Sequence, residues 1–186
     1  MAELFKNKYR TKSIRLKDWD YSQNGYYYVT ICTKNRECIF GKIVDGKIIL
    51  SELGGIVNKY WREIPKHFKN IFLDEYVIMP NHIHGIIIID NDVKSNVETP
   101  HWGVSTTLKR NPHHIPQWKP NSLGSIICQF KTICTKQIRS IGYRNFAWQS
   151  RFYEEIIQNE HRLNTIRDYI INNPLQWKLN ENNPTN

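Results

Sequence analysis

Four consecutive isoleucines, residues 86–89, constrain the fold of this chain more than any other feature of its sequence. They follow His82-Ile83-His84-Gly85, and the eight residues together have the length of one β-strand. Side chains alternate between the two faces of a strand, so this segment is apolar on both faces beyond its histidines. The segment therefore predicts a central strand that is covered on both sides.

The surrounding segments show strand and helix patterns in turn. Clusters of β-branched and aromatic residues predict strands, and apolar residues that recur every three or four positions predict helices. The predicted elements are strands at 26–33 and 73–79, a hairpin around Asp45-Gly46 between 42–44 and 47–50, and helices at 51–64, 122–138 and 159–172. The order lacks the rhythm of an all-parallel sheet, and no Gly-rich phosphate loop is present. We therefore expect an α+β fold, an antiparallel sheet with helices packed on one face.

The length of 186 residues predicts one domain that spans 1–186. A basic N-terminal arm is expected at 1–20, because six Lys or Arg residues fall between Lys6 and Lys17. It either contacts phosphates or is a solvated tail. Segment 90–121, rich in Asn, Pro, Thr, Lys and His, predicts a long flexible loop inserted in the domain. With no export signal or membrane-length apolar run, we expect a cytosolic protein with reduced cysteines.

The charge balance favours a polyanionic partner. Lys and Arg number 26 against 17 Asp and Glu, which gives a formal net charge of +9. A surface of this kind binds polyanions by releasing their counterions, and nucleic acid is the usual case.

His82 and His84 form the first candidate site. They lie two residues apart on the predicted strand, so both imidazoles project to one face while Ile83 enters the other. Two neutral imidazoles at this spacing can share one divalent cation. The alternative is a pair of hydrogen-bonded histidines at the end of a strand.

Tyr169 is the second candidate. Among the ten tyrosines only Tyr169 has an Asn or Gln four residues later, Asn173. On a helix this spacing places a phenol and an amide on the same side. The spacing alone favours a purely structural role, with Tyr169 completing the core and Asn173 ending the helix before Pro174.

Four sequence motifs occur in order along most of the chain. They are Tyr27-Tyr28-Val29-Thr30, Met79-Pro80-Asn81-His82-Ile83-His84-Gly85, Trp148-Gln149-Ser150-Arg151-Phe152-Tyr153-Glu154, and Ile166-Arg167-Asp168-Tyr169-Ile170 followed by Asn172-Asn173-Pro174. On these motifs the chain closely resembles the REP-associated tyrosine transposases and related bacterial insertion-sequence transposases. These proteins belong to the HUH superfamily, named for two histidines that flank a bulky hydrophobic residue.

The resemblance implies a ferredoxin-like fold of the HUH endonuclease type. It implies that His82, His84 and Asn173 hold Mg²⁺ or Mn²⁺ and that Tyr169 is the nucleophile. Some insertion-sequence relatives have Gln at the position of Asn173, so a shorter amide would have to reach the same cation here. The implied activity is cleavage and rejoining of single-stranded or hairpin DNA through a 5′-phosphotyrosine, by a monomer or homodimer in the bacterial cytosol.

Cations that follow phosphates and aromatic rings that stack on bases are expected to contact the DNA. The candidates are Lys12, Arg15, Lys131, Lys136, Arg139, Trp148, Arg151, Phe152 and Tyr153. A core role is the alternative for each of the three aromatic residues. Two other functions remain open: a domesticated protein that binds DNA or RNA hairpins without cutting them, and a metal-dependent nuclease without a covalent intermediate.

Overall fold

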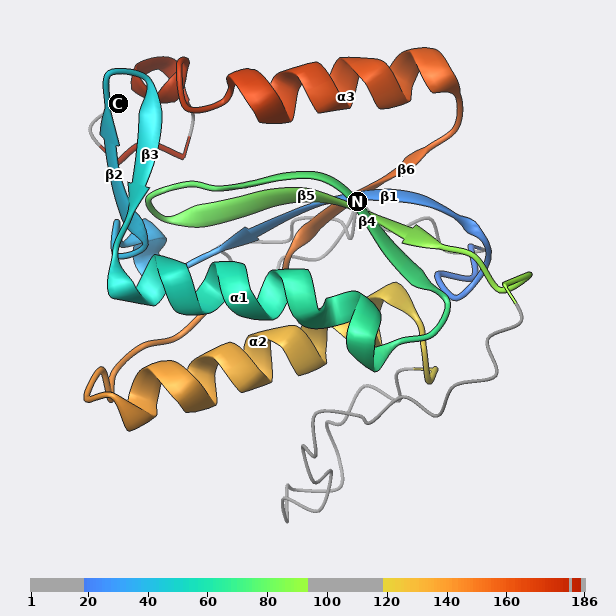
Figure 1. Ribbon diagram of the computed structural model, residues 1–186, viewed down its shortest axis with the longest axis horizontal. Helices are drawn as coiled ribbons and strands as arrows, with labels where there is room; N and C mark the ends of the chain where they lie inside the picture. Colours follow the sequence, from blue (N-terminus) through green and yellow to red (C-terminus); the bar gives the residue numbers. More distant parts are fainter. Residues whose placement is uncertain (1–18, 94–118, 181, 185–186) are drawn as a thin grey trace, which may run out of the picture.

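An antiparallel sheet of four strands forms the centre of the domain (Figure 1). The computed structural model describes residues 19–93, 119–180 and 182–184. Lys12, Arg15 and most of the predicted arm and loop lie outside these ranges. The strands are β1 (Gly25–Cys32), β4 (Ile71–Ile78), β5 (His82–Ile89) and β6 (Tyr153–Ile157), in the spatial order β4-β5-β1-β6. Every neighbouring pair in this sheet is antiparallel, which confirms the predicted sheet type.

The connections between these strands give the ferredoxin-like order. Helix α1 (Glu52–His67) joins β1 to β4, and helix α2 (Leu123–Ser140) joins β5 to β6. Each helix therefore connects two parallel strands that have a third strand between them, the split βαβ arrangement. Among the described residues, no helix is both long and apolar enough to cross a membrane.

Two further elements extend this core. The hairpin of β2 (Gly41–Val44) and β3 (Lys47–Leu50) precedes α1, and helix α3 (Glu160–Asn172) follows β6. Asp45 and Gly46 have φ values of 48° and 71° at the hairpin turn. The left-handed conformation at both positions is what a two-residue turn requires, so the Asp-Gly prediction is confirmed.

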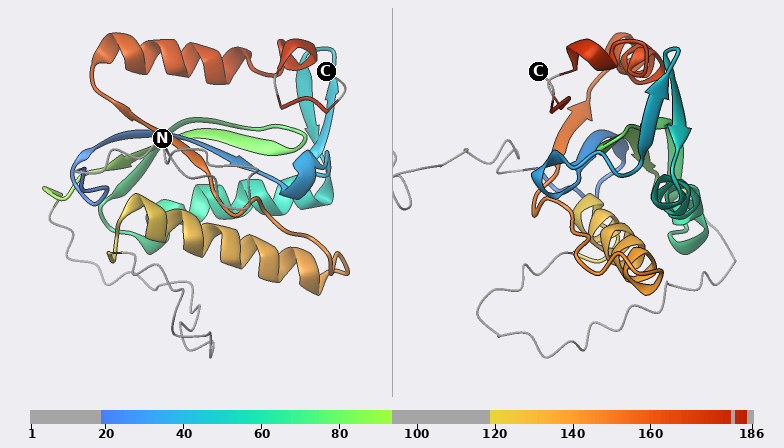
Figure 2. Two further views of the ribbon diagram at one scale, coloured as in Figure 1. Left: turned by 180° about the vertical axis from the view of Figure 1, so that it is seen from behind. Right: turned by 90° about the vertical axis from the view of Figure 1, so that its left-hand side faces the viewer.

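The helices lie on both faces of the sheet. Helices α1 and α2 cover one face, as predicted, whereas α3 lies against the opposite face (Figures 1 and 2). The expectation of helices on one face only therefore needs correction for α3. Because α1 and α2 already fill their face, the apolar stripe of α3, Leu163, Ile166 and Ile170, covers the remaining one. That face is formed by alternate residues of the same strands.

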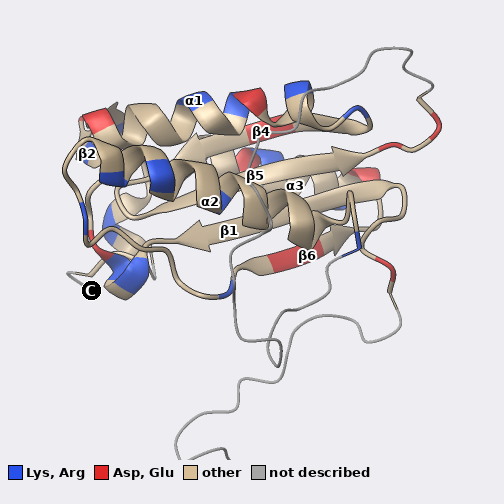
Figure 3. Ribbon diagram, turned by 90° about the horizontal axis from the view of Figure 1, so that it is seen from below, with Lys and Arg blue, Asp and Glu red and all other residues tan. Residues whose placement is uncertain are grey.

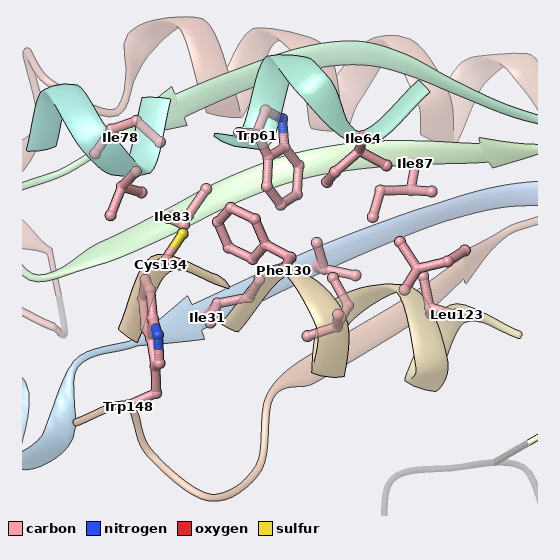
Figure 4. Packing of buried hydrophobic residues seen from close by; sticks show 14 of the residues in the cluster. Ile31, Trp61, Ile64, Ile78, Ile83, Ile87, Leu123, Phe130, Cys134 and Trp148 are labelled. Carbon is pink, nitrogen blue, oxygen red and sulfur yellow. The ribbon is translucent and has the colours of Figure 1, made fainter. Parts of the chain in front are cut away.

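The face under α1 and α2 carries the main hydrophobic core. Trp61 from α1 and Phe130 from α2 meet edge to face with ring centroids 5.3 Å apart, above Ile83 and Ile87 of β5 (Figure 4). A Cβ on Gly85 would lie 2.4 Å from Trp61 Cζ2, so only glycine lets this indole approach the strand. The packing of this face thus fixes the position of β5.

Most predicted elements agree with the structure to within a few residues, but β6 was missed. Its sequence, Tyr-Glu-Glu-Ile-Ile, has two adjacent carboxylates in place of an alternating apolar pattern. Glu154 is nevertheless buried, 6% exposed, while Glu155 forms an ion pair with Arg162 of α3. Tertiary contacts, which the local pattern does not reveal, make this segment a strand.

Candidate active site

The two histidines at the start of β5 face α3, on the side of the sheet away from the main core. His82 is 0% exposed and His84 is 2% exposed, and their Nε2 atoms lie 2.9 Å apart. Burial lowers the pKa of His82 well below its ordinary value and that of His84 to about 3. Both rings are therefore neutral at physiological pH, the form in which imidazole binds metals.

The Nδ1 atoms of the two histidines contact different kinds of partner. His82 Nδ1 lies 2.7 Å from Asn81 Oδ1. His84 Nδ1 lies 2.7 Å from the hydroxyl of Tyr28 and 2.9 Å from that of Thr30. Tyr28 and Thr30 come from β1, where Thr30 is directly opposite His84 in the antiparallel pair. These contacts fix the planes of both rings and direct the two Nε2 atoms toward each other.

Tyr169 approaches the two histidines from α3. Its hydroxyl lies 3.5 Å from His84 Nε2, and the two ring centroids are 5.2 Å apart. The side chain is 41% exposed, whereas the histidines beneath it are buried. The structure therefore brings the predicted nucleophile together with two of the three predicted metal ligands, His82 and His84, with the phenol open to an incoming substrate.

Helix α3, which carries Tyr169, is held on the sheet by its apolar stripe and by two ion pairs. The side chain of Asn159 caps the start of the helix by accepting a hydrogen bond of 2.8 Å from Arg162 N. Arg162 bonds both carboxylate oxygens of Glu155 on β6, at 2.6 and 2.8 Å. Arg167 bonds both oxygens of Asp74 on β4, at 2.9 and 2.5 Å. The helix is thus anchored to both edge strands of its own sheet.

Asn173, the predicted third ligand, ends α3 as its C-terminal cap. It is 1% exposed, and its Oδ1 accepts a hydrogen bond of 2.9 Å from Asn180 Nδ2. An amide oxygen has two lone pairs, so one remains for another partner. Its role as a ligand stays a prediction.

The residues present fit a divalent cation in part. Two neutral imidazole nitrogens that converge and are held in place by their outer nitrogens are the donor set of a metal site. Within the described ranges, no group of three or more His, Cys, Asp or Glu side chains could hold a metal ion. A third protein ligand from these ranges would therefore be an oxygen of another type, such as an amide.

A cleft of about 490 Å³ opens beside Tyr169 and His84. Its walls combine cations, aromatic rings and amides: Tyr28, Thr30, Cys32, Arg36, His84, Gln149, Arg151, Phe152, Tyr153, Glu155, Arg162, Thr165, Ile166, Tyr169 and Asn182. Arg162 balances Glu155, the one carboxylate among these lining residues. The cleft is therefore suited to an anionic ligand with flat rings.

Among the described residues, the predicted DNA contacts separate into three groups, of which Trp148 and Lys131 form the third. Arg151, Phe152 and Tyr153 line the cleft. Lys136 and Arg139 lie on α2, on the far side of the sheet from Tyr169; Figure 3 views that side. Arg139 there donates to the main-chain oxygen of Phe146.

Trp148 and Lys131 serve the fold of the segment that leads to the cleft. Trp148 is 9% exposed and packs against Phe40, Phe130 and Phe146, so its expected role in base stacking needs correction. Burial lowers the pKa of Lys131 to about 8. Its ammonium donates to the main-chain oxygen of Gln149, which lines the cleft.

Several residues of the site were not found from the sequence, chiefly Tyr28, Thr30, Asn81 and Asn182. Tyr28 and Thr30 lie two apart on β1, so alternation alone places them on one face. Which residue they oppose depends on the register between β1 and β5, which no local signal specifies.

No family model matches the sequence. An uncharacterized protein of Haemophilus influenzae is 39% identical over 171 residues, which cover 91% of each chain. A solved structure of the REP-associated tyrosine transposase bound to a REP hairpin aligns with 89% of this chain and 74% of that one, at a TM-score of 0.51 and 18% identity. The chain therefore belongs to the family of this Haemophilus protein, and its domain has the fold of the REP-associated tyrosine transposase.

Proposed function

We propose that this protein is a metal-dependent, single-tyrosine transposase that cleaves and rejoins single-stranded or hairpin DNA. The observation that carries the proposal is the exposed Tyr169 hydroxyl 3.5 Å from His84, whose Nε2 is 2.9 Å from that of His82. A nucleophile beside two neutral imidazoles suits metal-assisted phosphoryl transfer, with the phenol as nucleophile and the imidazoles as metal ligands. The similar fold of a transposase bound to a hairpin supports hairpin DNA as the substrate class.

Tyr169 would attack the phosphorus of a scissile phosphodiester in line with the departing oxygen. The new bond is a phosphate ester on the Tyr169 oxygen, and the bond that breaks leaves a free 3′-hydroxyl on the other strand end. A divalent cation held by His82, His84 and an amide oxygen would supply stabilisation of the charge on the phosphate oxygens. A second 3′-hydroxyl can reverse the step, because the ester keeps the energy of the broken bond.

The cleft would hold the strand beside the scissile phosphate. Arg36 and Arg151 bring positive charge to its walls, and Phe152 and Tyr153 offer ring faces to unpaired bases. The scissile strand would enter alongside α3, whose residues Arg162, Thr165 and Tyr169 line the cleft. Single-stranded segments next to a hairpin would enter in this way.

We also propose that Tyr169 acts in its own subunit. Its hydroxyl lies beside His84 of the same chain, and α3 is anchored to β4 and β6 of the same sheet. A mixture of His84→Gln and Tyr169→Phe proteins should then fail to cleave, because neither chain has a complete site. Recovery of cleavage in the mixture would show exchange of α3 between chains.

The covalent intermediate provides the test of the proposed function. Labelled hairpin DNA with single-stranded flanks is incubated with Mg²⁺ or Mn²⁺ and resolved on a denaturing gel. We expect a slowly migrating protein–DNA adduct with wild type and with Tyr153→Phe, but none with Tyr169→Phe. Tyr153 is a matched control, since it lines the same cleft and is 40% exposed against 41% for Tyr169.

The other outcomes assign other functions. Cleavage that survives Tyr169→Phe, without an adduct, would identify a nuclease that activates water. Tight binding without cleavage across a varied set of hairpins would identify a hairpin-binding protein.

A further inference from the structure

Asn81, the residue before β5, links its own segment to two distant parts of the chain next to His82. It is 0% exposed. Its Nδ2 donates to the main-chain oxygens of Arg36, at 2.9 Å, and Asn182, at 2.7 Å. Its Oδ1 lies 2.7 Å from His82 Nδ1. Each polar atom of this buried amide therefore has a partner.

The two carbonyl partners decide which way the amide faces. Main-chain oxygens only accept hydrogen bonds, so the NH₂ group must point toward Arg36 and Asn182. The reverse orientation would place Oδ1 against two oxygens and leave the NH₂ group facing His82. The oxygen therefore faces His82, and the contact requires a proton on His82 Nδ1. A neutral imidazole carries one N–H, so His82 Nε2 bears a lone pair.

His84 is held by a different kind of partner. Its Nδ1 contacts the hydroxyls of Tyr28 and Thr30, and a hydroxyl both donates and accepts. His84 can therefore carry its proton on either nitrogen. The 2.9 Å contact between the Nε2 atoms places the proton on His84 Nε2, which donates to the His82 lone pair.

We infer that Asn81 is a positioning residue that holds His82 in its Nδ1–H tautomer and keeps the Nε2 lone pair directed at the space shared with His84. His84 is the adjustable partner, with its proton moving to Nδ1 when Nε2 is needed as a ligand. The inference rests on the proposed function for the identity of the ligand, a divalent cation. The tautomer of His82 itself follows from the amide network alone.

The tautomer can be measured in the metal-free wild-type protein. The chain is labelled with ¹⁵N-histidine, and long-range ¹H–¹⁵N correlation separates protonated from unprotonated ring nitrogens. His82→Gln and His84→Gln spectra assign the two signals among the seven histidines. We expect a protonated Nδ1 and an unprotonated Nε2 for His82. A protonated Nε2 on His82 would overturn the inference.

Two substitutions then test whether Asn81 causes this state. Asn81→Leu removes the acceptor, and we expect His82 to populate both tautomers and Mn²⁺ affinity by calorimetry to fall about 10–100-fold. Asn81→Asp keeps an oxygen acceptor for Nδ1–H but replaces the donor to the Arg36 and Asn182 carbonyls by an oxygen, so we expect the His82 tautomer to persist in a less stable protein. Unchanged tautomer and Mn²⁺ affinity in folded Asn81→Leu would refute the role. If Asn81→Leu does not fold, the His82 tautomer in the wild-type and Asn81→Asp spectra tests the inference: loss of the Nδ1–H tautomer in either would refute it.

Thr33→Val distinguishes positioning of His82 by the Asn81 amide from anchoring of the main chain at Asn81. Thr33 is 1% exposed, and its hydroxyl donates to the main-chain oxygen of Asn81 at 3.1 Å without touching its amide. We expect lower stability with unchanged His82 tautomer and Mn²⁺ affinity. If Thr33→Val weakened Mn²⁺ binding as much as Asn81→Leu does, anchoring of the chain at Asn81 would explain the loss of affinity. Absence of DNA cleavage by wild type would contradict the proposed function but leave the tautomer result standing.

Discussion

The two faces of the sheet are made from alternate residues of the same strands, yet they are held by different interactions. Under α1 and α2, a contiguous cluster of twenty-two buried residues fills the space, including Trp61, Phe130 and Ile83. Among the described residues, the buried apolar cluster under α3 has six members, and buried hydrogen bonds and partly exposed ion pairs add to its contacts. One face therefore supplies most of the apolar burial that stabilises the domain, while the other holds polar groups in fixed positions. Side chains of a single strand, β5, alternate between the two faces and so take part in both tasks.

The comparison is sharpest at neighbouring positions of β5. His84→Gln should reduce formation of the covalent DNA adduct by about a thousandfold or more, because one metal-binding nitrogen is lost. Its effect on thermal unfolding should be modest, since glutamine can still bond a hydroxyl of Tyr28 or Thr30. The adduct yield and the melting temperature are measured on the same preparation. His161→Gln, an exposed histidine on α3, is the control that should change neither.

Ile83→Ala, one residue away, should have the opposite signature. Ile83 is 0% exposed in the main cluster, so truncation leaves a cavity and costs about 2–5 kcal/mol of unfolding free energy. Cleavage per folded molecule should stay within a few-fold of wild type. Denaturant unfolding and single-turnover cleavage test both parts. A large loss of activity in fully folded Ile83→Ala would show that the two faces are not independent.

The sequence predicted this division in part. The isoleucine run at 86–89 indicated a strand covered on both sides, and the spacing of His82 and His84 placed both on one face. The side taken by α3 was not predicted, because it depends on β6, whose Glu154 and Glu155 conceal the strand pattern. The partners Tyr28, Thr30, Asn81 and Asn182 come from three separate segments. Strand register brings Tyr28 and Thr30 to His84, and a tertiary contact brings Asn182 to Asn81, so local spacing does not reveal these partners. Asn81 directly precedes His82, but the distant main-chain oxygens that orient its amide cannot be read from local sequence.

Gly85→Ala probes the packed face with a single methyl group. The added Cβ would lie 2.4 Å from Trp61 Cζ2 and 3.1 Å from Tyr76 Cβ, so the indole or the strand must shift. Overpacking of this kind costs about 1–3 kcal/mol, and a displaced β5 should also lower the cleavage rate slightly. Gly55→Ala on α1 is the matched control, because its Cβ would meet nothing within 4 Å. Equal melting temperatures for Gly85→Ala and wild type would show that the indole moves without cost.

Asp74→Asn probes the polar face, with the smallest expected effect on stability. Arg167 holds the pKa of Asp74 below its ordinary value of 3.8, mainly by direct hydrogen bonds. The pair therefore stabilises the folded chain above about pH 4, and this contribution is lost as the pH falls through the lowered pKa. Since the Arg167 side chain is 36% exposed, the loss in Asp74→Asn should be about 1 kcal/mol or less.

The same substitution should affect cleavage more than unfolding, because the ion pair orients the helix that carries Tyr169. We expect a several-fold lower rate of adduct formation at low salt, and a smaller difference from wild type at high salt, where ion pairs are screened. Asp20→Asn is the control: its ion pair with Lys119 involves neither α3 nor a residue lining the cleft, so the rate should not change. If both variants cleave at the wild-type rate, the apolar stripe of α3 is sufficient to position Tyr169, and the two faces differ less than their contacts indicate.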